Sequence, residues 1–249
     1  MNQCKRLLEV EFLKNKRLFN FEILILGTFI GLMLGVFLYL ANKSIFIDDH
    51  SQWLALWSEM NLFATQIFIP IILSIVVALN IQNELRNNNL LRIMVTPVNL
   101  VNFVISKWLY FVILSLINQL ISWLMFIGIG SLLGFPNNMN PLMFLKWSIL
   151  AWVGSLGIIA IQILIGFIVR QFISVVLVNF GLVIVSFISS IISEALSWIN
   201  PYSLILIGSH AKNTMYWSLY QIIFFISTTL ITVVFGIYLT KKVIIKFNS

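Results

Sequence analysis

Long apolar runs dominate the chain and are separated by short polar segments. A helix that crosses the hydrocarbon core of a bilayer needs ~20 mainly apolar residues. Six runs meet this requirement, and the lone polar residues inside them are tolerated where they face other helices. The pattern therefore predicts an all-α, polytopic membrane protein with six transmembrane helices, at residues 21–41, 62–81, 103–124, 144–169, 172–192 and 217–239. An extension of the third span to residue 133 is an alternative.

The composition agrees with this pattern. Hydrophobic residues make up 60% of the 249 residues and charged residues 9%, against about 25% charged residues in an ordinary soluble domain. The 21 phenylalanines carry more apolar surface than a soluble core of this length hides. Six spans with short connections use the whole length, so we interpret residues 1–249 as a single transmembrane domain without a fused ATPase, kinase or ectodomain.

The positive charges indicate the orientation. The N-terminal tail, the second-to-third and fourth-to-fifth connections and the C-terminal tail lie on one side of a six-span protein. Of the 15 Lys and Arg residues, all but Lys43, Lys146 and Lys212 fall in or beside these segments. Cytoplasmic loops are enriched in Lys and Arg, so we expect both termini in the cytoplasm.

Residues 1–18 combine apolar and charged positions and are too short and too charged to span a membrane. We predict an amphipathic helix that lies at the cytoplasmic interface with its basic residues toward anionic headgroups. A solvated leader remains an alternative, because the apolar positions do not form one clean stripe: Leu7, Leu8, Val10, Phe12 and Leu13.

Several kinds of chemistry are excluded. None of the 12 glycines is followed by Lys, so there is no phosphate-binding P-loop. The single cysteine, Cys4, permits no intramolecular disulfide or thiolate zinc site, and two histidines are too few for a metal centre. No carboxylate pair or Ser/His/Asp set is placed for catalysis. We therefore expect neither enzymatic activity nor a metal or cofactor in this chain.

Ionisable residues inside spans mark ion or proton pathways. We expect none here, because Glu22, Lys107 and Arg170 lie at the ends of predicted spans. This pattern argues against a proton-coupled antiporter, and it is compatible with a protein driven by another subunit.

Two further segments suggest contacts with other helices or subunits. Gly27, Gly31 and Gly35 share one face of the first span, where another backbone can approach closely. This face fits either a dimer interface or tight packing within the chain. The connection at 82–100 begins polar, continues as an amphipathic run and is broken at Thr96–Pro97. It is either a short interfacial helix that a soluble partner pushes or an ordinary polar loop.

In this layout the chain resembles the ABC-2-type permeases of ATP-driven exporters. The resemblance rests on the six spans, the amphipathic N-terminal segment and the pattern of the first cytoplasmic link. Within that group, the chain is most similar to small permeases that protect bacteria against lantibiotics and related peptides. The residues that carry the link pattern, and that the resemblance assigns to coupling with an ATPase, are Glu84, Leu90, Leu91, Arg92, Thr96 and Pro97.

The resemblance implies partners and a location. A separate ABC ATPase, in two copies, would hold ATP and Mg²⁺ and dock on the coupling region at 82–100. A second copy of the chain or a sister permease would complete a dimer in the bacterial plasma membrane. The family also carries re-entrant elements on the outer side before the last span, which correspond to 193–216 here.

The resemblance further implies a substrate class, namely amphipathic antimicrobial, lantibiotic-like or cytolytic peptides exported for immunity or secretion. Outer acids would attract their basic groups, Glu194 first among them, although Trp and Tyr at this depth are usually interfacial anchors. The alternatives are an exporter of another hydrophobic substrate (drug, lipid or glycolipid) and a non-transporting scaffold or sensor. The candidate substrate pathway comprises Glu194, Trp198, Tyr202, Asn118 and Gln119.

The orientation yields the first testable prediction. In a Cys4→Ser background, single cysteines at Asp48 or Asn138 should react with an impermeant thiol reagent on intact cells. Cysteines at Asn88 or Ser249 should react only after lysis, because these positions lie in the Lys- and Arg-rich segments that we expect in the cytoplasm. The reverse labelling pattern would contradict the predicted topology.

Overall fold

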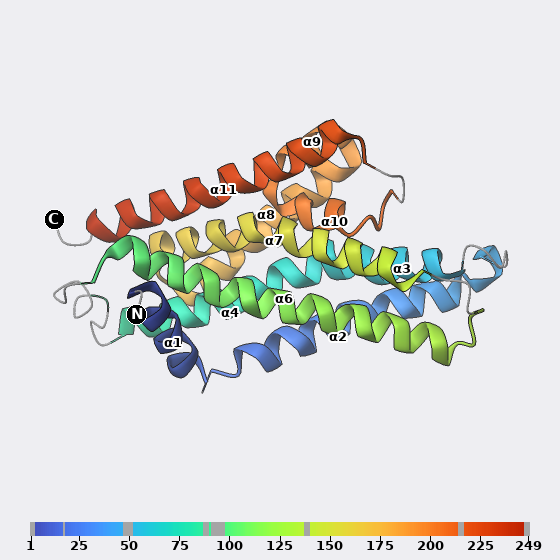
Figure 1. Ribbon diagram of the computed structural model, residues 1–249, viewed down its shortest axis with the longest axis horizontal. Helices are drawn as coiled ribbons and strands as arrows, with labels where there is room; N and C mark the ends of the chain where they lie inside the picture. The colour runs from blue at the N-terminus through green and yellow to red at the C-terminus, as the bar shows by residue number, and fades with distance from the viewer. Residues whose placement is uncertain are drawn as a thin grey trace.

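The computed structural model describes residues 3–16, 18–46, 52–86, 90, 98–136, 140–213 and 217–246, and these ranges contain helices and no strands (Figure 1). The elements are α1 (Gln3–Asn15), α2 (Asn20–Ala41), η1 (Lys43–Phe46), α3 (Gln52–Phe63), η2 (Ala64–Phe68), α4 (Ile69–Leu85), α6 (Leu100–Leu132), α7 (Pro141–Val169), α8 (Phe172–Ile192), α9 (Glu194–Ile199), η4 (Pro201–Ser203), α10 (Leu204–Gly208) and α11 (Leu219–Lys246).

Six helices are long and apolar enough to cross a membrane, which confirms the predicted number of spans. The second span is longer than predicted, because α3, η2 and α4 form one continuous helix at Gln52–Leu85. The early part was missed because Ser58, Glu59 and Asn61 interrupt the apolar run. The third span runs over Leu100–Leu132, which agrees with the longer of the two predicted ends, at residue 133.

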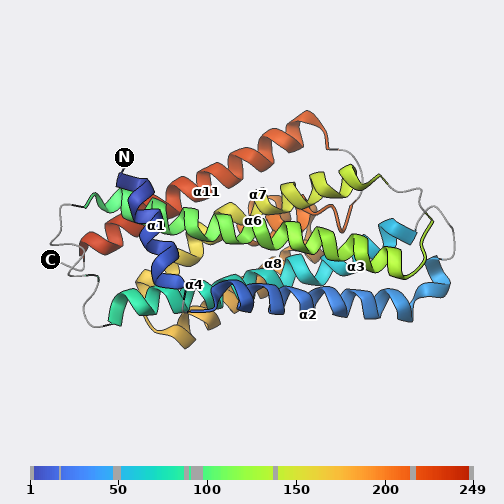
Figure 2. The same ribbon diagram turned by 60° about the horizontal axis from the view of Figure 1, so that its bottom comes forward.

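The six spans lie side by side as one bundle (Figures 1 and 2). Both α1 and the last turn of α11 lie at the same end, as an even number of spans requires, and we call this the terminal end. The opposite end, which we call the loop end, holds the end of α2 and the beginning of α7. Asparagine caps start two of the helices: Asn99 Oδ1 accepts from Val101 N at 2.9 Å and Asn140 Oδ1 from Leu142 N at 3.1 Å.

The glycine face of α2 packs against the second span of the same chain. A Cβ atom on Gly35 would lie 2.3 Å from the Glu59 carbonyl oxygen, and one on Gly31 would lie 2.8 Å from the Phe68 ring. One on Gly27 would overlap the side chain of Ile72. The second span of the same chain therefore covers this face. Of the two alternatives, a dimer interface or tight packing within the chain, the structure shows the packing within the chain.

The second span contains a π-helical turn, η2, in its middle. Pro70 follows this turn and has no backbone N–H to donate to the preceding turn. A π turn relieves such a mismatch by inserting one extra residue into the helix. It also turns the Gln66 side chain toward α8, where its Nε2 donates to Ser190 Oγ at 2.9 Å.

The segment between α8 and α11 folds back into the bundle as α9, η4 and α10, and α10 packs against α7. Leu204, Ile205 and Leu206 are fully buried or nearly so. The two backbones approach so closely that a Cβ on Gly154 would lie 2.4 Å from the Leu204 carbonyl oxygen. Trp57, which belongs to the second span, holds this segment in place, because its Nε1 donates to the Ser209 carbonyl at 2.8 Å.

The N-terminal helix α1 lies across α6 at the terminal end (Figure 2). Its buried residues are polar, Glu11 and Asn15, whereas Val10, Phe12 and Leu13 are exposed. The exposed side therefore mixes apolar residues with charged ones such as Lys5, Arg6 and Glu9, a composition that suits a helix at a membrane surface. Contact of α1 with the membrane surface stays a prediction.

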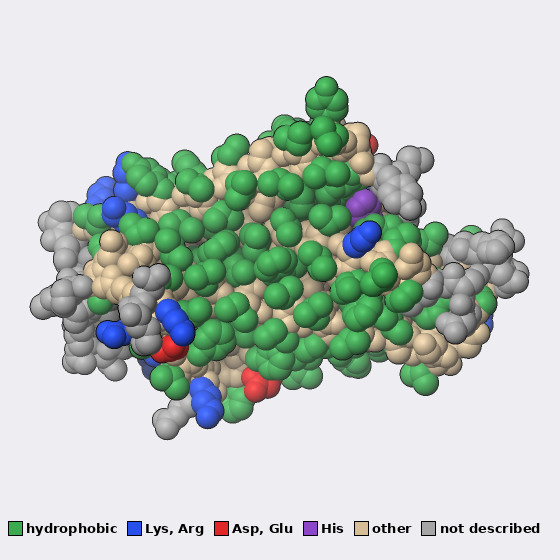
Figure 3. Space-filling model, viewed as in Figure 1, with side chains coloured by type: hydrophobic (Ala, Val, Ile, Leu, Met, Phe, Trp, Pro, Cys, Tyr) green, Lys and Arg blue, Asp and Glu red, His purple; other side chains and the backbone are tan. Residues whose placement is uncertain are grey.

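The outer face of the bundle is apolar. In Figure 3, hydrophobic side chains cover the length of the molecule and most of the visible Lys and Arg side chains gather near the terminal end. The helices α8 and α11 expose many large aliphatic and aromatic side chains. A surface of this kind belongs in lipid, so the chain is a multi-pass membrane protein.

The α7–α10 contact yields the second prediction. Gly154→Ala and Gly208→Ala should each destabilise the protein by about 1–3 kcal/mol, because the new methyl group meets backbone atoms that side-chain rotation cannot move aside. Gly128→Ala, in α6 with nothing within 4 Å of the added Cβ, is the matched control and should leave stability unchanged or raise it by up to about 1 kcal/mol. Scanning fluorimetry in mild detergent measures the difference, and equal melting temperatures for all three would refute the close approach.

Candidate functional site

A buried ion cluster joins three helices at the terminal end. Its centre is Lys107 in α6, whose side chain is 0% exposed. The Lys107 ammonium lies 2.9 Å from Glu11 Oε2 of α1, 2.7 Å from Asn80 Oδ1 and 3.2 Å from Glu84 Oε1, the last two on α4. The three segments are far apart in the sequence and come together only in the folded chain.

Polar groups around this centre complete the network. Lys14 Nζ, at the rim, lies 3.0 Å from Glu84 Oε1. Asn80 Nδ2 donates to Asn15 Oδ1 at 2.7 Å. Two carboxylates and two ammonium groups give the cluster no net formal charge. This balance matters because an isolated ion in an apolar interior is highly unfavourable, whereas a paired and hydrogen-bonded one is tolerated.

The cluster corrects one expectation from the sequence. We expected no ionisable residue within the spans, yet Lys107 lies inside the third span, more than one turn after its start, and is completely buried. The partners were not recognisable in advance, because Glu11 lies in the N-terminal segment and Glu84 in the last turn of α4. The available signal was Lys107 itself, since a lysine next to an apolar run needs an acidic partner.

The predicted coupling residues are only partly covered by the described residues. Leu91, Arg92, Thr96 and Pro97 lie outside them, so their role stays a prediction. Leu90 is described and is buried against the core at 4% exposure. Glu84 is also buried, and its ion pairs fix the beginning of the link to α1 and α6. Both side chains are thus already packed within this chain.

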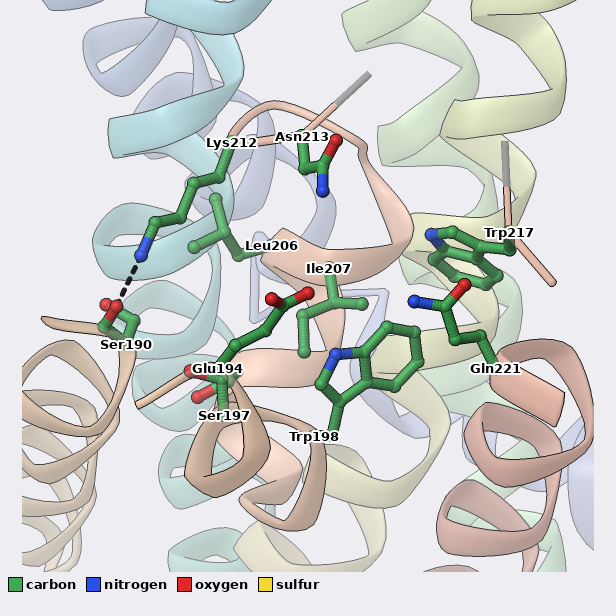
Figure 4. Close-up of a pocket in the computed structure, with 11 residues that line it drawn as sticks. Ser190, Glu194, Ser197, Trp198, Leu206, Ile207, Lys212, Asn213, Trp217 and Gln221 are labelled. Atoms are coloured by element: carbon green, nitrogen blue, oxygen red, sulfur yellow. Dashed lines mark hydrogen bonds between the residues drawn. The ribbon is translucent and has the colours of Figure 1, made fainter. Parts of the chain in front are cut away.

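A pocket of about 410 Å³ lies among α8, α9, α10 and the start of α11 (Figure 4). Its polar and aromatic lining comes from α8 and α9, from α10 and the turn after it, and from the residues at the start of α11. The side chains that define its chemistry are Glu194, Trp198, Lys212, Trp217 and Gln221.

The two charged groups of the pocket are not paired with each other. The Lys212 ammonium donates to the Ser190 carbonyl, while the Glu194 carboxylate points into the pocket (Figure 4). Within the described part of the chain, Glu194 has no hydrogen-bond or ion-pair partner. The indoles of Trp198 and Trp217 meet edge to face with centroids 5.3 Å apart.

His210 stacks behind this pocket between two indoles, with ring centroids 5.1 Å from Trp147 and 4.6 Å from Trp217. Burial lowers the pKa of His210 below its ordinary value. The imidazole is therefore neutral near pH 7 and adds no charge next to the pocket. Its role here is to fix the orientation of the Trp217 ring.

The structure brings together only part of the predicted substrate pathway. Glu194 and Trp198 line the pocket. Tyr202 is buried beside it, with its hydroxyl donating to Asn179 Oδ1 at 2.5 Å. Asn118 and Gln119 are buried on α6 and do not line this pocket. Lys212 was not expected at this site, because its place beside the pocket depends on the turn after α10.

Comparison with known proteins identifies one family. A family model described as ABC-2 family transporter protein matches residues 7–186, which is 180 of the 249 residues. The match includes Glu11, Glu84 and Lys107 and ends within α8, before the pocket-forming segment. Neither the curated proteins nor the solved structures contain a match to this chain.

The ion cluster yields the third prediction. Lys107→Met should destabilise the protein by about 3–5 kcal/mol, because it leaves two buried carboxylates without their shared cation. Lys14→Met is the matched control and should cost less than about 1 kcal/mol, since Lys14 is 37% exposed. Adding Glu11→Gln and Glu84→Gln to Lys107→Met should restore part of the loss. The measurement is thermal unfolding in detergent, and a Lys107→Met protein as stable as the parent would show that the cluster is not formed.

Proposed function

The chain belongs to the ABC-2 family of transporter proteins and is the membrane permease component of an ABC transporter, and we propose that this transporter exports amphipathic peptides of the antimicrobial, lantibiotic-like or cytolytic kind. In this proposal the chain forms a dimer with itself or a sister permease. Two separate ATPase subunits supply the energy, and both termini lie in the cytoplasm of a bacterial cell.

The apolar surface of the spans supports a substrate that reaches the permease from the membrane. The described residues of α8 include no Asp, Glu, Lys or Arg, and those of α11 carry charge only near its end, at Lys241, Lys242 and Lys246. A hydrophilic solute would find few hydrogen-bonding groups along such faces. An amphipathic peptide partitions into the interface with its apolar side buried, so it arrives next to these helices.

The ion cluster supports energy transfer through the terminal end. Glu84 is the penultimate residue of α4, and its ion pairs hold that helix end to Lys107 of α6 and Lys14 of α1. A partner that displaces the link after α4 therefore moves three helices, because separating them would leave buried charges unpaired. The family implies an ATPase partner, and the terminal end, where most Lys and Arg side chains in view are found (Figure 3), is where we place it.

The family match supports the permease role, and the apolar faces of α8 and α11 are the observation that carries the peptide substrate. The following experiment tests the proposal. Cells that produce the chain with its ATPase should survive higher concentrations of cationic amphipathic peptides than cells lacking it. Leu91→Asp combined with Arg92→Glu should abolish protection, because losing one buried apolar anchor of ~1.5–3 kcal/mol weakens ATPase binding about tenfold or more. Lys43→Glu, at the loop end, is the matched control and should protect like the parent. Survival assays and co-purification of the ATPase are the two measurements.

Three outcomes would contradict parts of this proposal. Equal killing of both strains across a panel of peptides, with ATPase activity stimulated by a drug, lipid or glycolipid, would assign a different hydrophobic substrate. Failure of any ATPase to co-purify in mild detergent would favour a scaffold or sensor. Protection that survives the Leu91/Arg92 double substitution, with the ATPase still bound, would show that the link is not the coupling element.

A further inference from the structure

The pocket at Glu194 adjoins an apolar groove between α9 and α11. The groove has a volume of about 490 Å³ and is open to the outer face of the bundle. Trp198 and Gln221 line both the pocket and the groove, so the two hollows meet at these side chains. Beyond them the groove is mostly apolar, with Ile199, Tyr220 and Ile223 exposed along it.

The pocket, which is the polar part of the site that pocket and groove form together, carries one acidic and one basic side chain. Glu194 points into the pocket, and Lys212 reaches it from the turn after α10 on another side (Figure 4). The ammonium of Lys212 has three N–H donors, and among the described residues it donates to one acceptor, the Ser190 carbonyl. Glu194 and Lys212 are the two ionisable side chains among the described residues that line the pocket, so it complements one negative and one positive charge.

We propose that the pocket and groove together bind one zwitterionic glycerophospholipid, with its ammonium group at Glu194, its phosphate at Lys212 and an acyl chain in the groove along α9 and α11. The Trp198 indole lies next to Glu194 in the pocket, and Trp217 packs against that indole edge to face (Figure 4). Aromatic faces attract such a cation, and they do so more strongly where water is excluded. The site goes beyond peptide export and is independent of it.

The mixed charge favours this lipid over other amphiphiles. A lipid with an anionic head has no group to pair with Glu194 and would be repelled by it. A peptide with several positive charges would find one carboxylate next to Lys212, which repels it. The groove alone gives little selectivity, because a lipid chain leaves equally apolar surroundings to enter it. Recognition therefore depends on the headgroup and its two charged contacts.

The experiment compares three amphiphiles that share a dodecyl-length chain and differ in head charge. These are a lysophosphatidylethanolamine (zwitterionic), a lysophosphatidylglycerol (anionic) and an alkyltrimethylammonium (cationic). Native mass spectrometry of the full chain in mild detergent counts the bound molecules at equal probe concentrations. The zwitterion should be retained in preference to both others.

Variants at exposed positions then assign the contacts. Glu194→Gln and Lys212→Gln should each weaken zwitterion binding about tenfold, the effect of losing one hydrogen bond to a charged group. Lys146→Gln is the matched control, because Lys146 lines a neighbouring hollow with Trp217 at the same end but not this pocket. In the groove, Ile223→Ser should weaken all three probes alike, whereas Ile226→Ser, exposed on the same helix and outside the groove, should not.

Two results would overturn the proposal. The first is equal retention of the three probes, or zwitterion binding that Glu194→Gln and Lys212→Gln leave unchanged in proteins with the parental melting temperature. The second is a lysine-rich amphipathic peptide that binds in a Glu194-dependent manner while the zwitterion is not retained, which would assign the pocket to peptide. Loss of peptide protection in cells with zwitterion binding intact would count against the export proposal alone, so the two failures are distinguishable.

Discussion

The buried ammonium of Lys107 determines how the terminal end is built. An uncompensated charge in an apolar interior is so unfavourable that the fold must supply partners, and Glu11 and Glu84 do so from two other helices. This requirement explains why Glu11 and Asn15 of α1 are buried against the bundle while Val10 and Leu13 remain exposed. The ion pairs Glu11–Lys107 and Lys14–Glu84 hold α1 to α6 and α4.

Around α10 the segments are held together by close backbone packing and not by buried ions. Gly154 and Gly208 allow α10 to lie directly on α7, and Trp57 and Gln66 hydrogen-bond to the segments on either side of it. Lys212 follows this fixed turn by a few residues, so its ammonium reaches the pocket from a defined direction. Trp217 is fixed in turn by stacking on His210. The pocket therefore depends on packing between segments that are distant in the sequence.

Sequence reasoning succeeded where one property dominates locally. Apolar length alone predicted six spans, because the hydrocarbon core demands it of each helix separately. It failed where a residue's environment is set by other segments. Lys107 was interpreted as a residue at the end of a span, since nothing near it in the chain reveals Glu11 or Glu84. Glu194 was chosen as a lone acid, and the contribution of Lys212 emerges only when the turn after α10 folds back. The three glycines of α2 were compatible with two kinds of partner, and only the packed structure shows which surface they contact.

The ion cluster lies at the terminal end and the pocket lies farther along the bundle, and the second span is bonded to the surroundings of both. Near its start Trp57 donates to Ser209, in its middle Gln66 donates to Ser190 beside the pocket, and near its end Glu84 takes part in the ion cluster. The π turn contains the middle anchor, Gln66, and such turns are points where a helix bends with little loss of hydrogen bonding. The family match covers this whole span and the cluster but ends before α9. The part of the chain shared with the family thus contains the helix that connects the two ends, while the walls of the pocket come largely from the part that the match leaves out.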